Sequence, residues 1–387
     1  MKRARAVVLT SWPKTIGLGL PMMFLTALML SGGKAPADPK RWLALIAVFV
    51  FTNVLFLLML RRGKTDQPRA TLFIVYALMF VFTFIAHLIE LRGSMVLKAA
   101  NVAACETPFC HMVIPMTLVP AAFTDSIIFP GRILGGFASI ASMFVIWIGA
   151  SLALGRGWCS WGCFFGGLDE GFSRLLKRPI IRKIDPKWSY VSFAVLLSIV
   201  LTSALWLYPT YCSWLCPYKA VTEFQEVTSA RILVQTIIFV SLFLGLVILL
   251  PVLSKRRIQC GLFCPFGAFQ SFTNKINPFE VRIDLEKCKS CQLCLKNCPT
   301  FSISEESLKE GRTRITCAKC GKCVDNCPTQ AISYHVKGSP LSTRPYTARL
   351  LFLYPAFLFL TIMAGADVVE GVARLLNLVL HGSVLLT

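Results

Sequence analysis

The chain has 387 residues, of which 55% are hydrophobic and 15% are charged. Soluble domains carry nearer 25% charge, so this composition excludes an ordinary water-soluble globular protein. The formal net charge is +21, but the basic residues stand beside long apolar runs. We therefore assign them to membrane topology and to contact with membrane lipid, and we expect no nucleic-acid partner.

Seven segments are long and apolar enough to cross a bilayer, which predicts an α-helical polytopic membrane protein. In chain order they are 15–30, 42–60, 70–91, 133–154, 190–208, 232–253 and 350–366. The stretch 368–387 is more polar, and we expect it to lie along the membrane surface as an amphipathic tail, with an eighth short span as the alternative.

Lysine and arginine gather at the N-terminus and in the loops after the second, fourth and sixth spans. Loops rich in these residues stay on the cytoplasmic side. We therefore expect a multi-pass protein of the bacterial cytoplasmic (inner) membrane. Its N-terminus and the polar insert after the sixth span would then face the cytoplasm.

That insert carries two matched cysteine runs, "CKSCQLCLKNCP" at 288–299 and "CAKCGKCVDNCP" at 317–328. Each is C-x2-C-x2-C-x3-C-P, the bacterial run that binds [4Fe-4S] clusters, and its fourth cysteine serves the other cluster. The expected ligand sets are Cys288, Cys291, Cys294 and Cys327, and then Cys317, Cys320, Cys323 and Cys298. The rival interpretation, zinc or unligated thiols, is disfavoured by two runs of the same spacing.

The chain therefore divides into three parts. A transmembrane domain covers 1–274, and a small α+β bacterial-type two-cluster ferredoxin insert covers 275–338. A last span with its amphipathic tail covers 339–387.

The transmembrane domain repeats a C-x3-C pair in "CSWGCFFG", "CSWLCPYK" and "CGLFCPFG", with a looser pair in "CETPFCH". Residues i and i+4 share a helix face, so each pair can offer two thiolates together. A cubic cluster needs four, so two pairs must meet. The predicted topology sorts them into an inner set, Cys159, Cys163, Cys260 and Cys264, and an outer set, Cys105, Cys110, Cys212 and Cys216.

We expect a third cluster on the inner set, with buried, unligated thiols as the alternative. The outer set stays open between a fourth cluster, disulfides and a c-type haem. The haem would use Cys105, Cys110 and His111, with Met112 or Met116 as its second axial ligand. The core of a bilayer is about 30 Å thick, so inner and outer sites must intrude into it, or a quinone or another subunit must bridge them.

One ionisable pair is expected within a span. His87 and Glu90 lie at i and i+3 near the end of the third span. Such a pair is a candidate site for quinone protons, although pairing near the interface explains it equally well. We find no phosphate-binding loop, no dinucleotide-binding motif and no Ser/His/Asp constellation, so we expect no catalytic side chains.

The spans followed by "CSWLCPY" and "CGLFCPFGAFQ", together with the ferredoxin insert, resemble the membrane-bound polyferredoxin family of NapH-, NosR- and CcoG-like proteins. The resemblance covers about 133–338. Phe164 stands where the family has proline, and the family usually has two such pairs where this sequence has three plus Cys105/Cys110. The flavin-binding domain of NosR and the extracytoplasmic domain of CcoG have no counterpart in the sequence.

The resemblance implies electron transfer among the quinone pool, the cytoplasm and extracytoplasmic reductases, or maturation of such reductases. We interpret the chain as an electron-transfer subunit of an oxidoreductase complex. It would link a cytoplasmic partner to a quinone or an extracytoplasmic redox partner through [4Fe-4S] clusters. The alternative is a redox assembly factor for a respiratory metalloenzyme.

Overall fold

The computed structural model describes residues 10–32, 36, 38–90, 110–125, 139–222, 227–338 and 345–384, with the side chains of 87–90 and 222 left out of that description. Cys105 lies outside the described residues. The side chains of His87 and Glu90 lie outside them too, so the expectation for that pair stays a prediction.

The part of the chain that the structure describes contains seven helical segments apolar and long enough to cross a membrane. They confirm the predicted fold class. Three are single helices at the start of the chain: α1 (Trp12–Ser31), α2 (Pro39–Arg62) and α3 (Asp66–Glu90). The others are α6 (Ile140–Leu154) with η2 (Gly155–Gly157) and α7 (Trp158–Trp161), η3 (Pro186–Tyr190) with α9 (Val191–Trp206), α12 (Ala230–Leu242) with the π-helical η4 (Phe243–Leu249) and α13 (Leu250–Ser254), and α18 (Pro345–His381).

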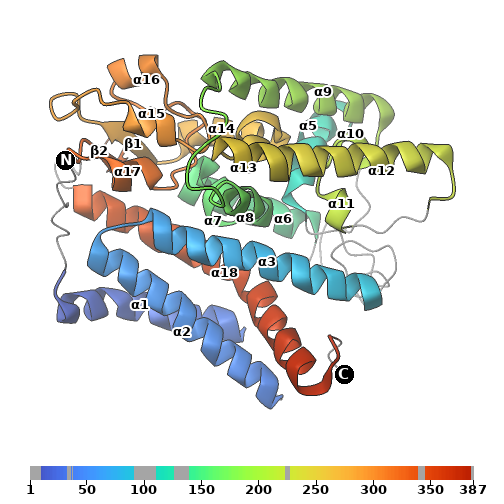
Figure 1. Ribbon diagram of the computed structural model, residues 1–387, viewed down its shortest axis with the longest axis horizontal. Coiled ribbons are helices and arrows are strands. Elements are labelled where there is room, and N and C mark those ends of the chain that lie inside the picture. Colours follow the sequence, from blue (N-terminus) through green and yellow to red (C-terminus); the bar gives the residue numbers. More distant parts are fainter. Residues whose placement is uncertain are drawn as a thin grey trace.

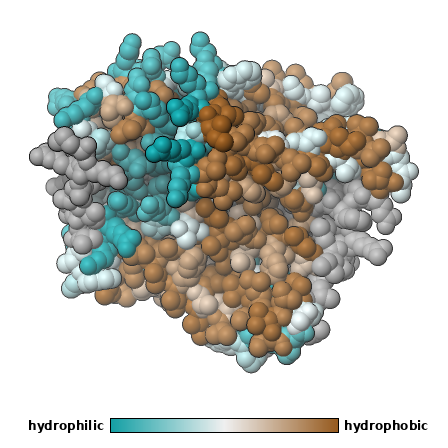
Figure 2. Space-filling model, in the orientation of Figure 1, coloured by the Kyte–Doolittle hydropathy of each residue, from teal (hydrophilic) through white to brown (hydrophobic). Residues whose placement is uncertain are grey.

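The outer surface of this bundle is apolar. Large side chains such as Phe24, Leu201 and Leu205 are more than half exposed. Figure 2 shows hydrophobic residues over most of the visible face and hydrophilic ones gathered at one end. Exposed apolar area of this extent is unfavourable in water, and a lipid environment removes the cost.

The expected amphipathic tail is wrong as a separate element. α18 continues without a break from Pro345 to His381. Its second half buries Gly371, Ala373 and Arg374 against the bundle, and Lys40 donates a hydrogen bond to Asn377 at 2.8 Å. Asn377 thus contacts α2, whereas Arg374 pairs with Glu370 of the same helix.

The ferredoxin insert lies at the hydrophilic end (Figures 1 and 2). Strands β1 (Phe279–Ile283) and β2 (Ile332–Val336) pair antiparallel, with Val281 opposite Tyr334. Each cysteine run wraps into a loop and a short helix, α15 (Leu293–Asn297) in the first and α17 (Lys322–Asn326) in the second. A third short helix, α16 (Glu305–Lys309), lies between the two runs.

The two halves of the insert also repeat their backbone geometry. Ser290 and Gln292 have positive φ in the first run, and Lys319 and Gly321 have it at the matching places in the second. Positive φ is costly for residues other than glycine. Because the same positions have positive φ in both runs, the two cysteine loops have the same backbone turns.

Short helices fill the interior between the long ones. They are η1 (His111–Val113), α5 (Ile114–Thr124), α8 (Phe164–Phe172), α10 (Thr210–Trp214), α11 (Lys219–Thr222), η5 (Gln259–Phe263) and α14 (Pro265–Ile276). Two glycines allow α8 to sit there, because a Cβ on Gly166 would lie 2.4 Å from the carbonyl oxygen of Cys159, and one on Gly167 would lie 2.5 Å from that of Phe73.

A buried ion network joins the insert to the bundle. The side chains of Arg69, Arg257 and Glu170 are 0% exposed, and both arginines pair with Glu170. Arg69 also donates to the carbonyl oxygen of Cys320 at 3.1 Å and to that of Ser160 at 2.9 Å. One guanidinium thus contacts the backbone of both the insert and the membrane domain.

Aromatic packing supports the same junction. Tyr334 of β2 stacks on Phe352 of α18, with ring centroids 4.9 Å apart. Trp161 and Tyr334 both donate hydrogen bonds to the carbonyl oxygen of Lys319, at 3.2 and 3.1 Å. The insert is therefore fixed against the bundle over a buried surface, at the loop of its second cysteine run.

We expect Glu170→Gln to destabilise this junction. Burial alone would raise the pKa of Glu170, but Arg257, Arg69 and Arg174 hold that pKa well below its usual value of 4.5. Removing one partner of a buried ion pair costs about 3–5 kcal/mol. Thermal unfolding in detergent should show a clear fall in midpoint, whereas the exposed Glu286→Gln should leave it unchanged.

The pH dependence follows from the lowered pKa. The contribution of Glu170 is present above its unfolded pKa and is lost only as the pH falls through the lower folded value. The difference in stability between Glu170→Gln and the unmodified protein should therefore stay constant from neutral pH to about 5. A difference that already vanishes at pH 6 would contradict the assigned ion pairs.

Candidate metal centres

The structure brings the second predicted ligand set of the insert together. Burial, followed by the nearby Cys317, Cys320 and Cys298, raises the pKa of the Cys323 thiol well above its usual value. Cys298 and Cys294 of the first run both lie near Cys323, and the expectation that Cys298 completes the second set stays a prediction. The backbone N–H of Ser302 donates to the sulfur of Cys298 at 3.2 Å.

The first ligand set lies farther from the bundle contacts. Burial raises the pKa of Cys294 to about 11, and the nearby Cys288 and Cys291 also raise it. Cys327 follows α17, which packs against α15. Cys291 is exposed, so this set is open to solvent, whereas Cys320 of the second set is buried beside Arg69.

The inner set also converges. Burial, then Asp169, Cys163 and Cys264, raises the pKa of Cys260 well above its usual value. Burial and then Cys159 raise the pKa of Cys264 to about 12. All four thiols are at most 8% exposed. The two pairs that the sequence grouped therefore meet in one buried place.

The local geometry of these pairs differs from the expected helix face. Cys159 lies in α7, but Cys163 is extended and precedes α8; Cys260 lies in the π-helical η5, and Cys264 precedes α14. Gly162 and Pro265 stand at these breaks. The second cysteine of each pair therefore caps a new helix, and the N–H of Gly267 donates to the sulfur of Cys264 at 3.3 Å. Helix N-termini favour negative charge, which suits a thiolate.

Unpaired N–H donors surround the inner set. Among the described residues, the Nε of Arg156, the Nε1 of Trp158 and the Nε of Arg257 are buried without an acceptor. Buried donors are rarely left without a partner. An iron–sulfur cluster with thiolate ligands is an anion rich in acceptors, so these residues fit a bound cluster.

The described side chains do not form a site for a single metal ion. No three His, Cys, Asp or Glu side chains among them converge closely enough to hold one ion. A cubic cluster places its own irons and sulfides between four cysteines. The wider grouping of the thiols is therefore suited to a cluster, which supplies reversible one-electron chemistry when bound.

Asp169 and Glu170, two adjacent residues beside the inner set, have pKa values that are shifted in opposite directions. Burial raises the pKa of Asp169 to about 7, whereas the arginines hold that of Glu170 low. Asp169 accepts the backbone N–H of Cys260 at 2.8 Å. It therefore fixes η5, and with it Cys260, against α8.

The outer set is only partly described. Burial, and then Cys216, raises the pKa of Cys110 to about 12, so these two cysteines lie close together. Cys212 lies in α10, two residues before the end of that helix. Cys105 lies outside the described residues, and the choice among cluster, disulfide and haem stays open for the complete set.

The two residues that follow Cys110 of the outer set contact the inner set. The Nε2 of His111 lies 3.0 Å from the sulfur of Cys163, and the sulfurs of Met112 and Cys264 are 3.9 Å apart. The segment enters the bundle through η1 and α5 instead of staying in a surface loop. A haem iron would need the Nε2 of His111, but this nitrogen is in contact with Cys163. The contact therefore disfavours a haem on Cys110.

Buried arginines are the functional residues that the sequence reading missed. The sequence predicts Arg69 and Arg257 to be loop charges that set topology, but they contact the backbone of Cys320 and Cys159. Arg156 donates to the carbonyl oxygen of Cys260 at 3.0 Å. A signal was present, because an arginine stands three residues before Cys159 and before Cys260, whereas Pro209 stands three before Cys212.

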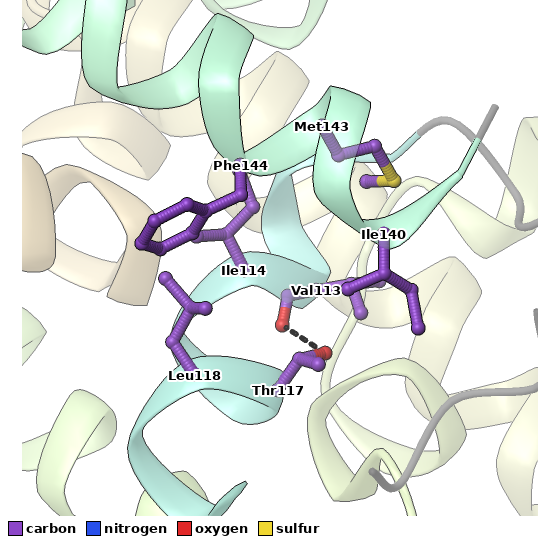
Figure 3. A pocket seen from close by; sticks show the side chains of 7 residues that line it. All are labelled: Val113, Ile114, Thr117, Leu118, Ile140, Met143 and Phe144. Atoms are coloured by element: carbon purple, nitrogen blue, oxygen red, sulfur yellow. Dashed lines mark hydrogen bonds between the residues drawn. The ribbon is translucent and has the colours of Figure 1, made fainter. Parts of the chain in front are cut away.

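A small apolar cavity adjoins the His111 segment. Figure 3 shows it between α5 and α6, with an empty space of about 360 Å³. Its lining residues are Val113, Ile114, Thr117, Leu118, Ile140, Met143 and Phe144. The hydroxyl of Thr117 donates to the carbonyl oxygen of Val113 at 3.1 Å, so it is already used within the helix.

Comparison with known families matches both cysteine-bearing parts. A 4Fe-4S binding domain matches three times, at 136–183, 188–232 and 236–283, and a 4Fe-4S dicluster domain matches 280–328. Each of the three repeats contains one C-x3-C pair. No solved structure matches this chain.

Several curated proteins are similar to this chain. YccM of Escherichia coli, whose name assigns it provisionally to electron transport, is 30% identical over 179 residues, covering 44% of this chain and 48% of YccM. The uncharacterized protein MJ0750 of Methanocaldococcus jannaschii is 30% identical over 43% of this chain and 67% of its own length. MJ0749 of the same organism is 28% identical over 47% of this chain and 68% of its own length. The match thus spans about half the length of YccM.

These features define the class of the protein. It is a helical membrane protein with 4Fe-4S domains both in its membrane part and in a ferredoxin insert. The chain belongs to the membrane-associated polyferredoxin-like family, as the resemblance predicted.

We expect the double change Cys260→Ser and Cys264→Ser to remove one cluster. Four clusters correspond to about sixteen irons per chain, so the iron content should fall by about four. The insert should keep its own absorbance on reduction. Iron and acid-labile sulfide analysis measures this, and an unchanged iron content would show that the inner pairing is wrong.

His111→Phe should lower the reduction potential of the inner cluster. The Nε2 of His111 lies 3.0 Å from the Cys163 sulfur. A thiolate bound to iron can only accept, so Nε2–H would be the donor there, and hydrogen bonds to cluster sulfurs tune the potential. His111→Gln, which keeps a donor, should restore part of the change. A spectroscopic redox titration measures the effect, and identical potentials in His111→Phe and the unmodified protein would contradict the assigned donor.

Proposed function

We propose that this protein carries electrons along a row of cysteine sites that begins in the ferredoxin insert and continues into the membrane. The sequence and the family matches support iron–sulfur electron transfer. The proposal adds the order of the sites and the partners at the two ends.

The junction between insert and bundle carries the proposal. Arg69 donates to the carbonyl oxygens of Cys320 and of Ser160, which follows Cys159. A single side chain therefore holds a cysteine loop of the insert against a cysteine loop of the membrane domain. A soluble ferredoxin attached only by its chain would need no such contact.

The proposed order of the cysteine sites is supported by contacts between neighbouring segments. The Cys288 set is open to solvent at Cys291, and the Cys317 set lies at the junction. The inner set comes next, and Cys110 lies beyond it through His111 and Met112. Because these segments touch, no step in this order has to cross the whole 30 Å membrane core at once.

We assign the solvent-open end to a cytoplasmic redox partner in a bacterial inner membrane, on the distribution of lysine and arginine. Electrons leave or enter at the other end through Cys110, Cys212 and Cys216, with a quinone or an extracytoplasmic subunit as acceptor or donor. The cavity of Figure 3 offers no free polar group to a quinone ring. A quinone is therefore expected elsewhere along the bundle.

Purified protein in sealed vesicles tests this function. Dithionite added outside should reduce ferricyanide trapped inside, at a rate well above that of protein-free vesicles. The double variant Cys260→Ser, Cys264→Ser should fall to the protein-free rate, because it interrupts the row between the insert and the outer set. Equal rates for the variant and the unmodified protein would show that electrons do not follow these sites.

A further inference from the structure

A basic pocket opens between the ferredoxin insert and the membrane domain, and Asn297, Lys322 and Asn326 on its wall are chain neighbours of cysteines of the insert. It has an empty space of about 970 Å³. Basic and polar side chains from both parts line it, including Lys64, Arg174, Lys177, Lys255 and Lys322. It therefore lies where the hydrophilic end of the molecule meets its apolar surface.

The negative side chains of this pocket are already used. Asp66 pairs with Arg69 and Arg174. Asp325 accepts the backbone N–H groups of Thr65 and Asp66, at 2.8 and 2.7 Å. The basic side chains on the wall of the pocket outnumber these two carboxylates.

Three of the lysines are not paired with any carboxylate. Within the described part of the chain, Lys64, Lys177 and Lys322 form no ion pair. Lys255 donates only to backbone carbonyls, those of Leu176 and Lys177. The pocket therefore has an excess of positive charge, which favours an anionic ligand.

An apolar groove continues directly from the basic pocket. Lys64 and Gln67 line both spaces. The groove runs between α2 and α3, where Leu55, Leu58 and Pro68 form its wall, and it has an empty space of about 1070 Å³. These two helices belong to the membrane bundle, and Arg62, Gln67 and Thr71 line the groove beside its apolar residues.

We propose that this double pocket binds an anionic phospholipid. The phosphate lies among Lys64, Lys177 and Lys322, and an acyl chain follows the groove between α2 and α3. A basic pocket between transmembrane helices at the membrane surface is the arrangement that recognises anionic headgroups. A free phosphate or an acidic protein would satisfy the charge but would leave the groove empty.

The bound lipid would join the insert to the bundle at a second place. Lys322 begins α17 of the insert, whereas Lys64 precedes α3 and Lys177 follows α8. One phosphate shared among them bridges the parts that Arg69 also joins. Anionic lipid should therefore stabilise the junction.

Native mass spectrometry of the full chain, purified in detergent with equal phosphatidylglycerol and phosphatidylcholine, tests the proposal. The unmodified protein should retain phosphatidylglycerol selectively. The double variant Lys64→Gln, Lys177→Gln should lose at least about tenfold in apparent affinity. The matched variant Lys183→Gln, Lys187→Gln removes the same charge from exposed positions outside the pocket, and it should retain the lipid.

Each other outcome overturns the proposal. Equal retention by both double variants would place the lipid elsewhere or make it a general surface effect. Displacement of the lipid by inorganic phosphate alone would indicate a site for a free anion. Pocket-dependent binding of poly-L-glutamate without phosphatidylglycerol would indicate an acidic protein partner. Unchanged cluster absorbance in the variants confirms that they fold, and no arm depends on electron transfer.

Discussion

The buried carboxylate of Glu170 holds together the segments on which the metal sites depend. It pairs with Arg69 from α3, with Arg257 before η5 and with Arg174 after α8. Two of these arginines then bind the backbone of Cys320 and Cys159. Removing buried charges from water is costly, so the network is stable only while its members remain paired. Thiolates that bind metal add negative charge beside the excess of arginines.

The breaks in the helices matter as much as the helices themselves. Each inner pair spans the end of one short element and the start of the next, so its two sulfurs come from different local geometries. The capping position also gives Cys264 a backbone N–H donor. A continuous helix would place both thiols on one face without this donor. In the insert, repeated positive φ angles shape the cysteine loops in a comparable way.

The junction between insert and bundle is built from several kinds of interaction. Arg69 contributes charge and hydrogen bonds, and Tyr334 on Phe352 contributes aromatic packing. The proposed phospholipid would add a ligand that the membrane itself supplies. All three hold the insert in one orientation, which an electron path through its second cysteine loop requires.

The sequence by itself determined the class, the seven spans and the two cysteine runs, because hydrophobic length and ligand spacing are local properties. It also grouped the inner four cysteines, because they adjoin loops rich in lysine and arginine, which stay on the cytoplasmic side of the membrane. It did not show that α18 continues past Ala366 as one helix, or that the residues after Cys110 contact the inner set. Whether α18 continues depends on the helices that pack against it, and no local pattern records this.

Only the tertiary structure showed that Arg69, Arg156 and Arg257 are buried. In the sequence they look like other basic residues of the loops, although Arg156 and Arg257 each precede a cysteine pair by three residues. Their role depends on Glu170, Cys320 and Cys260, which are distant in the chain. The ligands can be read from spacing, but the contacts that bring one ligand set against the next arise only when the chain folds.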